Sequence, residues 1–255
     1  RDVPVSDLFR ISVFYNLSLM VLPSKLGELT YPYLLNRLGG ITITEGLASL
    51  IVSRIYDVFA ILIIFFIAFV GFQGAFQVDP LWMMLLIAFL IGLTFLAFFY
   101  MSDLLRLSSR ILGRILERTG LSRRKSFQWV LDKTHVMAED FDAIQARRTY
   151  LAVTLASLSS WAFSYWMFYA FLKGFGISRP VMKMIFACTI AMIANALPIS
   201  GLGNWGILEA GWAAGFMLAG LSKVEAIATG FGVHILLFMT SALISLFCWI
   251  TLKRN

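Results

Sequence analysis

Four charged side chains lie within apolar stretches of the sequence, at spacings that could serve ligand binding or proton transfer. Arg54 and Asp57 are three residues apart, which places them on one face of a helix. Glu28 and Glu209 each follow glycines where a helix is expected to begin, and free backbone N–H groups at such a point favour an anion. Charges in apolar surroundings are costly unless they are paired or hydrated, so these four residues are candidates for a functional site.

Each of these residues has two interpretations. Arg54 and Asp57 could form an internal ion pair that fixes helix packing, or Asp57 could orient Arg54 toward a lipid phosphate, which a planar guanidinium binds with two parallel donors. Glu28 and Glu209 could cap helices, or could face a cavity where they exchange protons or receive the cationic part of a headgroup. His234, about ten residues inside the last apolar stretch, could be a packing residue or a proton carrier. The other polar residues that could line a site are Lys25, Asn195, Ser200 and Asn204.

The composition is that of an integral membrane protein. Hydrophobic residues make up 60% and charged residues 14% of the 255 residues, and the mean hydropathy is +0.84. A soluble domain carries far more charge. The two cysteines, Cys188 and Cys248, lie in apolar stretches without a CxxC pattern, so no metal, cofactor or disulfide is expected.

The net charge of +7 is concentrated in the segment 101–149. Basic segments next to membrane spans remain in the cytoplasm, so we expect this segment and the C-terminus on the cytoplasmic side. Lipid headgroups account for basic residues in such places, and nucleic-acid binding is therefore not expected. Because residue 1 is Arg and no signal pattern follows, we expect a truncated or processed chain that one or two further helices precede.

Several stretches are long and apolar enough to cross a bilayer as helices. These crossings are 47–71, 81–101, 149–172 and 224–250. Two marginal stretches, 181–197 and 206–220, could form a re-entrant hairpin or two short crossings. Apolar and basic positions alternate at helical spacing within 102–148, which predicts interfacial helices on the inner leaflet. We therefore expect an all-α, polytopic helix bundle that forms one membrane domain over 1–255.

Two interrupted apolar segments suggest an internal repeat. They are PSKLGEL at 23–29 and PISGLGNWGILEA at 198–210. Each is followed about seventeen residues later by a glutamate, Glu45 or Glu225, that opens a long apolar helix. Three crossings separate the two segments, so the second copy is expected to be inverted relative to the first.

The matching of the two repeats predicts where a substrate would bind. Glu28 corresponds to Glu209, and Arg54 corresponds to His234. Broken helices at matching places of inverted repeats are typical of transporters, whose substrate site lies between the repeats. The repeats are expected to cover about 10–71 and 181–250.

Three segments resemble a known family: PSKLGELTYPYLLNR, EGLASLIVSRIYDVFAI and LPISGLGNWGILEAGWAAGFMLAGLSKVEAIATGFGVHIL. They are similar to the transmembrane, flippase-like domain of the lysylphosphatidylglycerol synthases. That family also includes stand-alone membrane proteins of bacteria and archaea. The resemblance covers nearly all of the chain from residue 10 onward, and it places the protein in the cell membrane of a bacterium or archaeon.

The resemblance implies a protein that moves a charged phospholipid or a polyprenyl-phosphate-linked lipid between leaflets. The family's soluble aminoacyl-transfer domain is lacking, so no enzymatic activity is expected. The second Gly-rich turn, 199–206, departs from the family's commonest Gly-Gly form, which leaves the identity of the lipid open. The residues that match the family's marked positions are Pro23, Gly27, Glu28, Arg54, Asp57, Pro198, Gly203 and Glu209.

Two other functions remain open. A membrane anchor or regulatory subunit of a lipid-modifying transferase would use its buried charges only to hold helices together. An intramembrane serine hydrolase resembling the rhomboids would use Ser200 as nucleophile and His234 as base, but Pro198 stands where a GxSG turn has its first glycine. The expected partners are membrane lipids with an anionic headgroup or a polyprenyl phosphate, and a second copy of the chain or a transferase could join them.

Overall fold

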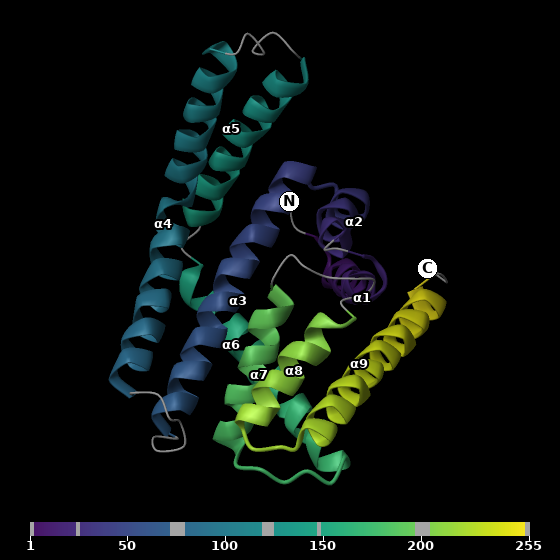
Figure 1. Cartoon of the computed structure of the whole chain (residues 1–255). Coiled ribbons are helices and arrows are strands. Elements are labelled where there is room, and N and C mark those ends of the chain that lie inside the picture. The colour runs from purple at the N-terminus through teal and green to yellow at the C-terminus, as the bar shows by residue number, and fades with distance from the viewer. Residues whose placement is uncertain are drawn as a thin grey trace.

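The computed structural model describes residues 3–23, 26–71, 80–118, 125–146, 149–196 and 205–252. Within these ranges the chain is helical and has no strand, which confirms the predicted all-α class. The predictions for Lys25, Pro198, Ser200, Gly203 and Asn204 lie outside the described residues. The helices are α1 (Val5–Val21), η1 (Leu26–Leu29), α2 (Thr30–Gly39), α3 (Ile43–Gly71), α4 (Pro80–Arg118), α5 (Lys125–Ala146), α6 (Tyr150–Gly174), α7 (Val181–Ala196), α8 (Ile207–Leu218) and α9 (Lys223–Leu252) (Figure 1).

Three helices of the described part, α3, α4 and α9, are long and apolar enough to cross a membrane. Their outward faces carry large apolar side chains, such as Phe89 of α4 and Phe247 of α9, which are 65% and 68% exposed. Extended apolar surfaces of this kind are stable against hydrocarbon and not against water. The chain is therefore a membrane protein. The stretch 149–172 is helical as α6 but is not one of these three helices, so its crossing stays a prediction.

The interruption expected at 23–29 is present as a tight helical turn. α1 ends just before Pro23, which has no backbone N–H to continue a helix. The chain then reverses through η1, where Gly27 packs on α1. The hydroxyls of Ser18 and Thr30 both donate to the carbonyl oxygen of Gly27, at 3.2 and 2.6 Å. These bonds hold η1, and with it Glu28, against α1.

Gly27→Ala is expected to destabilise the folded protein by about 1–3 kcal/mol, the usual cost of overpacking. The added methyl would lie 2.6 Å from the carbonyl oxygen of Ser18 and 2.7 Å from Cα of Leu19, and backbone atoms cannot rotate away as a side chain can. Gly92→Ala is the control, because nothing lies within 4 Å of its methyl and alanine favours a helix. Thermal unfolding in detergent should show a lower midpoint for the first variant only. Equal midpoints would contradict the close approach of η1 to α1.

α7 and α8 lie side by side as a helical hairpin (Figure 1). A methyl on Gly211 would lie 2.5 Å from Cβ of Ala194, and one on Gly215 would lie 2.3 Å from the carbonyl oxygen of Ala187. Small residues therefore allow this close helix pairing. The two helices have 16 and 12 residues, so at 1.5 Å per residue each is shorter than the roughly 30 Å hydrocarbon core. These lengths favour the re-entrant hairpin over two full crossings.

The two halves of the chain repeat one order of elements. A short helix, α2 or α8, is followed by a left-handed glycine, Gly40 or Gly220, with φ of 63° and 92°. A glutamate three residues into the next long helix then accepts the N–H of a capping residue. These capping pairs are Thr42 with Glu45 and Ser222 with Glu225, at N···O distances of 2.8 and 3.0 Å. In Figure 1, α3 starts toward the top and runs down, whereas α9 starts at the bottom and runs up. An inverted repeat would have these features, and its symmetry stays a prediction.

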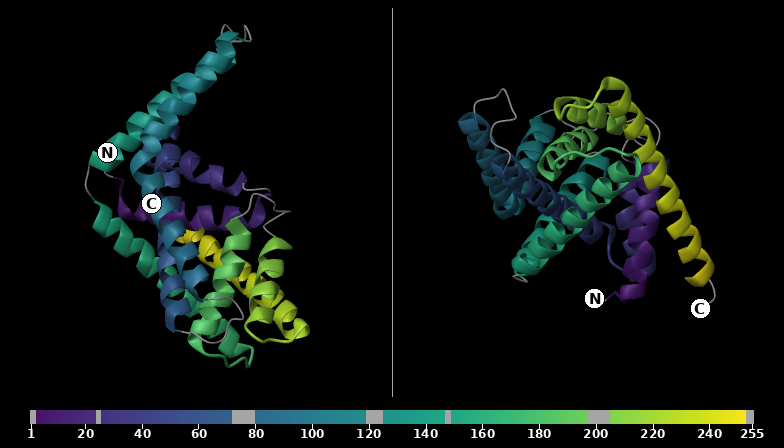
Figure 2. Two further views of the ribbon diagram at one scale, coloured as in Figure 1. Left: turned by 60° about the vertical axis from the view of Figure 1, so that its left-hand side comes forward. Right: turned by 90° about the horizontal axis from the view of Figure 1, so that it is seen from below.

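The segment 102–118 is the end of a long helix and not a helix of its own, because α4 continues through it without a break, and its place on the inner leaflet stays a prediction. No proline or glycine occurs from 93 to 112, and Leu and Arg favour a helix. The end of α4 pairs with α5 in a hairpin that projects beyond the other helices (Figures 1 and 2). Phe141 of α5 is fully buried, and Arg106 forms an ion pair with Asp142. The segments expected to lie flat on the leaflet thus pack against each other.

Candidate functional site

Arg54 is the centre of a polar cluster in the membrane-spanning part of α3. Its Nη1 lies 3.4 Å from Oδ2 of Asp57, and its Nη2 lies 3.8 Å from Oε1 of Glu28. Nη2 also donates a hydrogen bond to the hydroxyl of Tyr15 on α1. The turn at Pro23 is what makes this meeting possible, because it brings η1 back alongside α1. Two elements, α3 and η1, thus contribute one cation and two carboxylates, and α1 adds the hydroxyl of Tyr15.

Asp57 holds Arg54 from one side. Its Oδ1 accepts a hydrogen bond from the indole N–H of Trp161 on α6, at 3.0 Å, while its Oδ2 faces the guanidinium. Both oxygens of Asp57 therefore have a donor. This arrangement fixes the rotamer of Asp57 and, through it, the direction of Arg54.

A cavity of about 260 Å³ opens beside this cluster. Glu28 and Arg54 are its charged residues, and their side chains are 30% and 40% exposed. The other lining residues belong to α3 and α4 and are apolar except for one threonine: Leu50, Ile51, Ile55, Val58, Thr94 and Ala97. We call this space the polar cavity. It has a charged end and apolar walls, as a site for an amphipathic molecule requires.

The Nε of Arg54 is buried and has no hydrogen-bond acceptor among the described residues. A buried guanidinium N–H without an acceptor carries a free-energy cost. With all three groups ionised, the cluster has one positive and two negative charges, a net charge of −1. It therefore offers a donor for an anionic group and, at Glu28, an acceptor for a cationic one.

A second polar pair is buried between α8 and α9. Oε1 of Glu209 lies 2.6 Å from Nδ1 of His234, and Oε2 accepts the N–H of Gly206 at 2.7 Å. The ring of Trp205 stacks on His234, with centroids 4.3 Å apart. Glu209 is 4% exposed and His234 only 1%. Glu209 thus caps the start of α8, and it lies in a closed environment.

The two pairs follow the correspondence expected from the sequence. Glu28 contacts Arg54 in the first half, and Glu209 contacts His234 in the second. Their surroundings differ, however. Glu28 lines the polar cavity, whereas Glu209 lines neither that cavity nor its neighbour between α3, α4 and α6.

The other predicted site residues are less informative. Asn195 lies in the last turn of α7 and is partly buried. Lys25, Ser200 and Asn204 lie outside the described residues. The base of the hydrolase hypothesis, His234, is bound through Nδ1 to Glu209 and stacks on Trp205, and its nucleophile, Ser200, lies outside the described residues, so that hypothesis stays a prediction.

Sequence reasoning missed two members of the site, Tyr15 and Trp161. Both are aromatic residues in apolar stretches, where most aromatic side chains only pack. The single available signal is that Tyr and Trp carry a polar atom that needs a partner when it is buried. The sequence does not indicate that this partner is the Arg54–Asp57 pair.

Comparison with known proteins identifies the family. No curated protein and no solved structure matches the chain. Residues 1–245 match the family model described as the lysylphosphatidylglycerol synthase TM region. This match covers nearly the whole chain, including both polar pairs. The chain therefore belongs to the lysylphosphatidylglycerol synthase transmembrane family, which indicates a membrane protein of lipid biosynthesis or transport.

Proposed function

We propose that the protein moves a charged phospholipid or a polyprenyl-phosphate-linked lipid between the leaflets of the cell membrane. The observation that carries the proposal is Arg54, whose side chain is 40% exposed, lines a cavity between membrane-spanning helices and keeps one donor, Nε, without an acceptor among the described residues. A phosphate oxygen is the acceptor that a guanidinium in a membrane protein most readily meets. In this function the chain acts as a transporter and not as an enzyme.

The charges of the site support a headgroup with groups of both signs. Arg54 would bind the phosphate. Glu28, whose Oε1 lies 3.8 Å from Nη2 of Arg54, would bind an ammonium group. Asp57 is already engaged by Trp161 and Arg54, so it acts as a support for Arg54 and not as a ligand. A polyprenyl phosphate would use Arg54 alone.

The direct test is reconstitution. The purified protein is placed in liposomes that contain a fluorescent phospholipid, and dithionite is added outside to quench the label in the outer leaflet. A transporter makes the inner-leaflet label accessible, so quenching should go beyond the fraction seen in protein-free liposomes. Quenching no greater than in protein-free liposomes, for phospholipid and polyprenyl-phosphate probes alike, would refute the proposal.

Glu28→Gln is expected to lower transport of an amine-bearing lipid by about tenfold, because a hydrogen bond to a charged group contributes about 1.5–3 kcal/mol. Transport of phosphatidylglycerol, which has no ammonium, should change little. The two rates are measured with matched fluorescent phosphatidylethanolamine and phosphatidylglycerol. Equal losses for the two lipids would show that Glu28 serves the fold or the phosphate and not the ammonium.

The α4–α5 hairpin favours one alternative, a membrane anchor or regulatory subunit of a separate transferase. The hairpin projects beyond the bundle and carries four half-exposed apolar side chains beside arginines: Leu104, Leu107, Ile111 and Ile115. A soluble partner could dock there. In that case the chain alone would be inactive in liposomes, and deletion of the hairpin would abolish the transferase activity of the complex.

Localisation follows from the same proposal. The basic α4–α5 hairpin and the C-terminus are expected on the cytoplasmic side of the plasma membrane. Labelling of single cysteines introduced at Arg110 and at Thr251, with and without membrane permeabilisation, would test this. Labelling of either position in intact cells by an impermeant reagent would reverse the assigned topology.

A further inference from the structure

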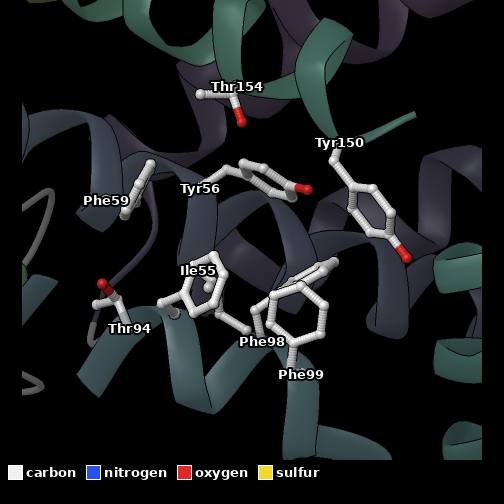
Figure 3. A pocket seen from close by; sticks show the side chains of 9 residues that line it. Ile55, Tyr56, Phe59, Thr94, Phe98, Phe99, Tyr150 and Thr154 are labelled. Carbon is white, nitrogen blue, oxygen red and sulfur yellow. The ribbon is translucent and has the colours of Figure 1, made fainter. Parts of the chain in front are cut away.

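A second cavity, of about 180 Å³, adjoins the polar cavity along the contact between α3 and α4 (Figure 3). Both cavities are lined by Ile55 and Thr94, so they meet at these two residues. Aromatic side chains from α3, α4 and α6 form most of the second cavity: Tyr56, Phe59, Phe95, Phe98, Phe99 and Tyr150. We call it the aromatic groove.

The walls of the aromatic groove hold one another in place. The ring of Phe98 lies 5.2 Å from that of Tyr56 and 5.6 Å from that of Tyr150, in edge-to-face contacts. Such pairs are favourable beyond simple burial. The hydroxyl of Thr94 donates a hydrogen bond to the carbonyl oxygen of Ile91 in the same helix, at 2.8 Å. It therefore needs no hydrogen-bond acceptor from a molecule in the groove. The groove is thus preformed and almost wholly apolar.

The groove lies within the membrane-spanning parts of α3 and α4. Phe95 and Phe99 at its rim are 56% and 43% exposed, so the groove is open on the side of the bilayer. A hydrocarbon chain is the apolar ligand that surrounds the protein at this place. Because Arg54, Ile55 and Thr94 all line the polar cavity, a lipid with its phosphate at Arg54 meets the junction of the two cavities with its first methylene groups.

We propose that the aromatic groove binds one hydrocarbon chain of the lipid whose headgroup occupies the polar cavity. The inference rests on the proposed function for the identity of that headgroup. It adds that the protein also binds the hydrocarbon chain of the ligand. Thr94 and Ile55 line the junction through which the lipid extends from the polar cavity into the aromatic groove. The protein would then select lipids that combine a phosphate with a long chain, and a free phosphate would bind poorly.

Thr94→Phe is expected to reduce chain binding in the groove by about tenfold, because overpacking a site costs about 1–3 kcal/mol. The larger ring fills the junction that both cavities share. Gly92→Ala, two residues away in the same helix, is the control: the position lines neither cavity and nothing lies within 4 Å of the added methyl, so binding should stay within about twofold. Both variants must give the same thermal midpoint as the parent for the comparison to count, and Thr94→Leu replaces Thr94→Phe if that variant does not fold.

The measurement uses a phosphatidylethanolamine with a diazirine in the middle of one acyl chain, reconstituted with the purified protein. Illumination should label Phe95, Phe98 or Phe99, and an excess of unmodified phosphatidylethanolamine should suppress this labelling. Labelling of Phe89, on the exposed face of the same helix, should instead follow the bulk lipid concentration. Groove labelling should fall about tenfold in Thr94→Phe and persist in Gly92→Ala.

The outcomes separate the two proposals. If groove labelling follows the bulk lipid concentration as Phe89 labelling does, while the protein transports lipid, the groove proposal is refuted. The transport function is then unaffected. Saturable groove labelling in a protein that moves no lipid would support the groove and refute transport. A diacylglycerol probe with the same diazirine should label the groove more weakly than the phosphatidylethanolamine. Equal labelling by the two probes would show that the chain is bound without the headgroup site.

Discussion

Arg54→Ala is expected to abolish lipid movement in liposomes, with a loss of about a hundredfold or more. Two hydrogen bonds from a guanidinium to a phosphate contribute about 1.5–3 kcal/mol each, and both are lost. Arg54→Lys should retain part of the activity, because an ammonium keeps the charge but cannot present two parallel donors. The measurement is the initial rate at which the inner-leaflet label becomes accessible to dithionite in proteoliposomes.

The amount of folded Arg54→Ala protein should stay near that of the parent. Asp57 keeps the indole of Trp161 as a donor, and Glu28 is partly exposed to the cavity, so neither carboxylate is left buried and alone. Tyr15→Phe is a matched control, since it removes a neighbour of Arg54 without removing the guanidinium, and its transport rate should change little. If folding and transport fall together in Arg54→Ala, the ion pair serves helix packing and the headgroup assignment fails.

The local part of the site could be predicted from the sequence, because it depends on helix geometry. Three-residue spacing places Arg54 and Asp57 on one face, and the structure pairs them at 3.4 Å. The helix break at Pro23 and the capping glutamates Glu45 and Glu225 follow from backbone hydrogen bonding alone. These features need no knowledge of which helices are neighbours.

The parts that depend on tertiary packing could not be predicted in this way. Nothing in the sequence indicates that Trp161 of α6 reaches Asp57, because many positions of an apolar helix could face α3. The amphipathic pattern of 102–118 fits a helix on a leaflet and a helix paired with α5 equally well, and the structure has the second. Nor does the sequence indicate that Glu209 is almost completely buried, at 4% exposure, while Glu28 lines a cavity.

Glu209→Ala is expected to destabilise the protein by about 3–5 kcal/mol, the usual cost of removing one partner from a buried pair. The change leaves Nδ1 of His234 buried without its partner and removes the acceptor for the N–H of Gly206 at the start of α8. Glu209→Gln should cost much less, because its amide oxygen can accept from Gly206 while its amide nitrogen donates to His234. Thermal unfolding in detergent measures both variants.

Glu209→Gln also tests whether Glu209 exchanges a proton during transport. Glutamine keeps the shape and the hydrogen bonds of the pair but cannot gain or lose a proton in the physiological range. If transport is coupled to proton exchange at the Glu209 carboxyl group, the parent rate should vary between about pH 5 and pH 8, and the variant rate should be flat over that range. Glu28→Gln is the parallel variant in the polar cavity. If both variants move lipid at the parent rate throughout the range, the two glutamates act only as caps, and the movement is passive and bidirectional.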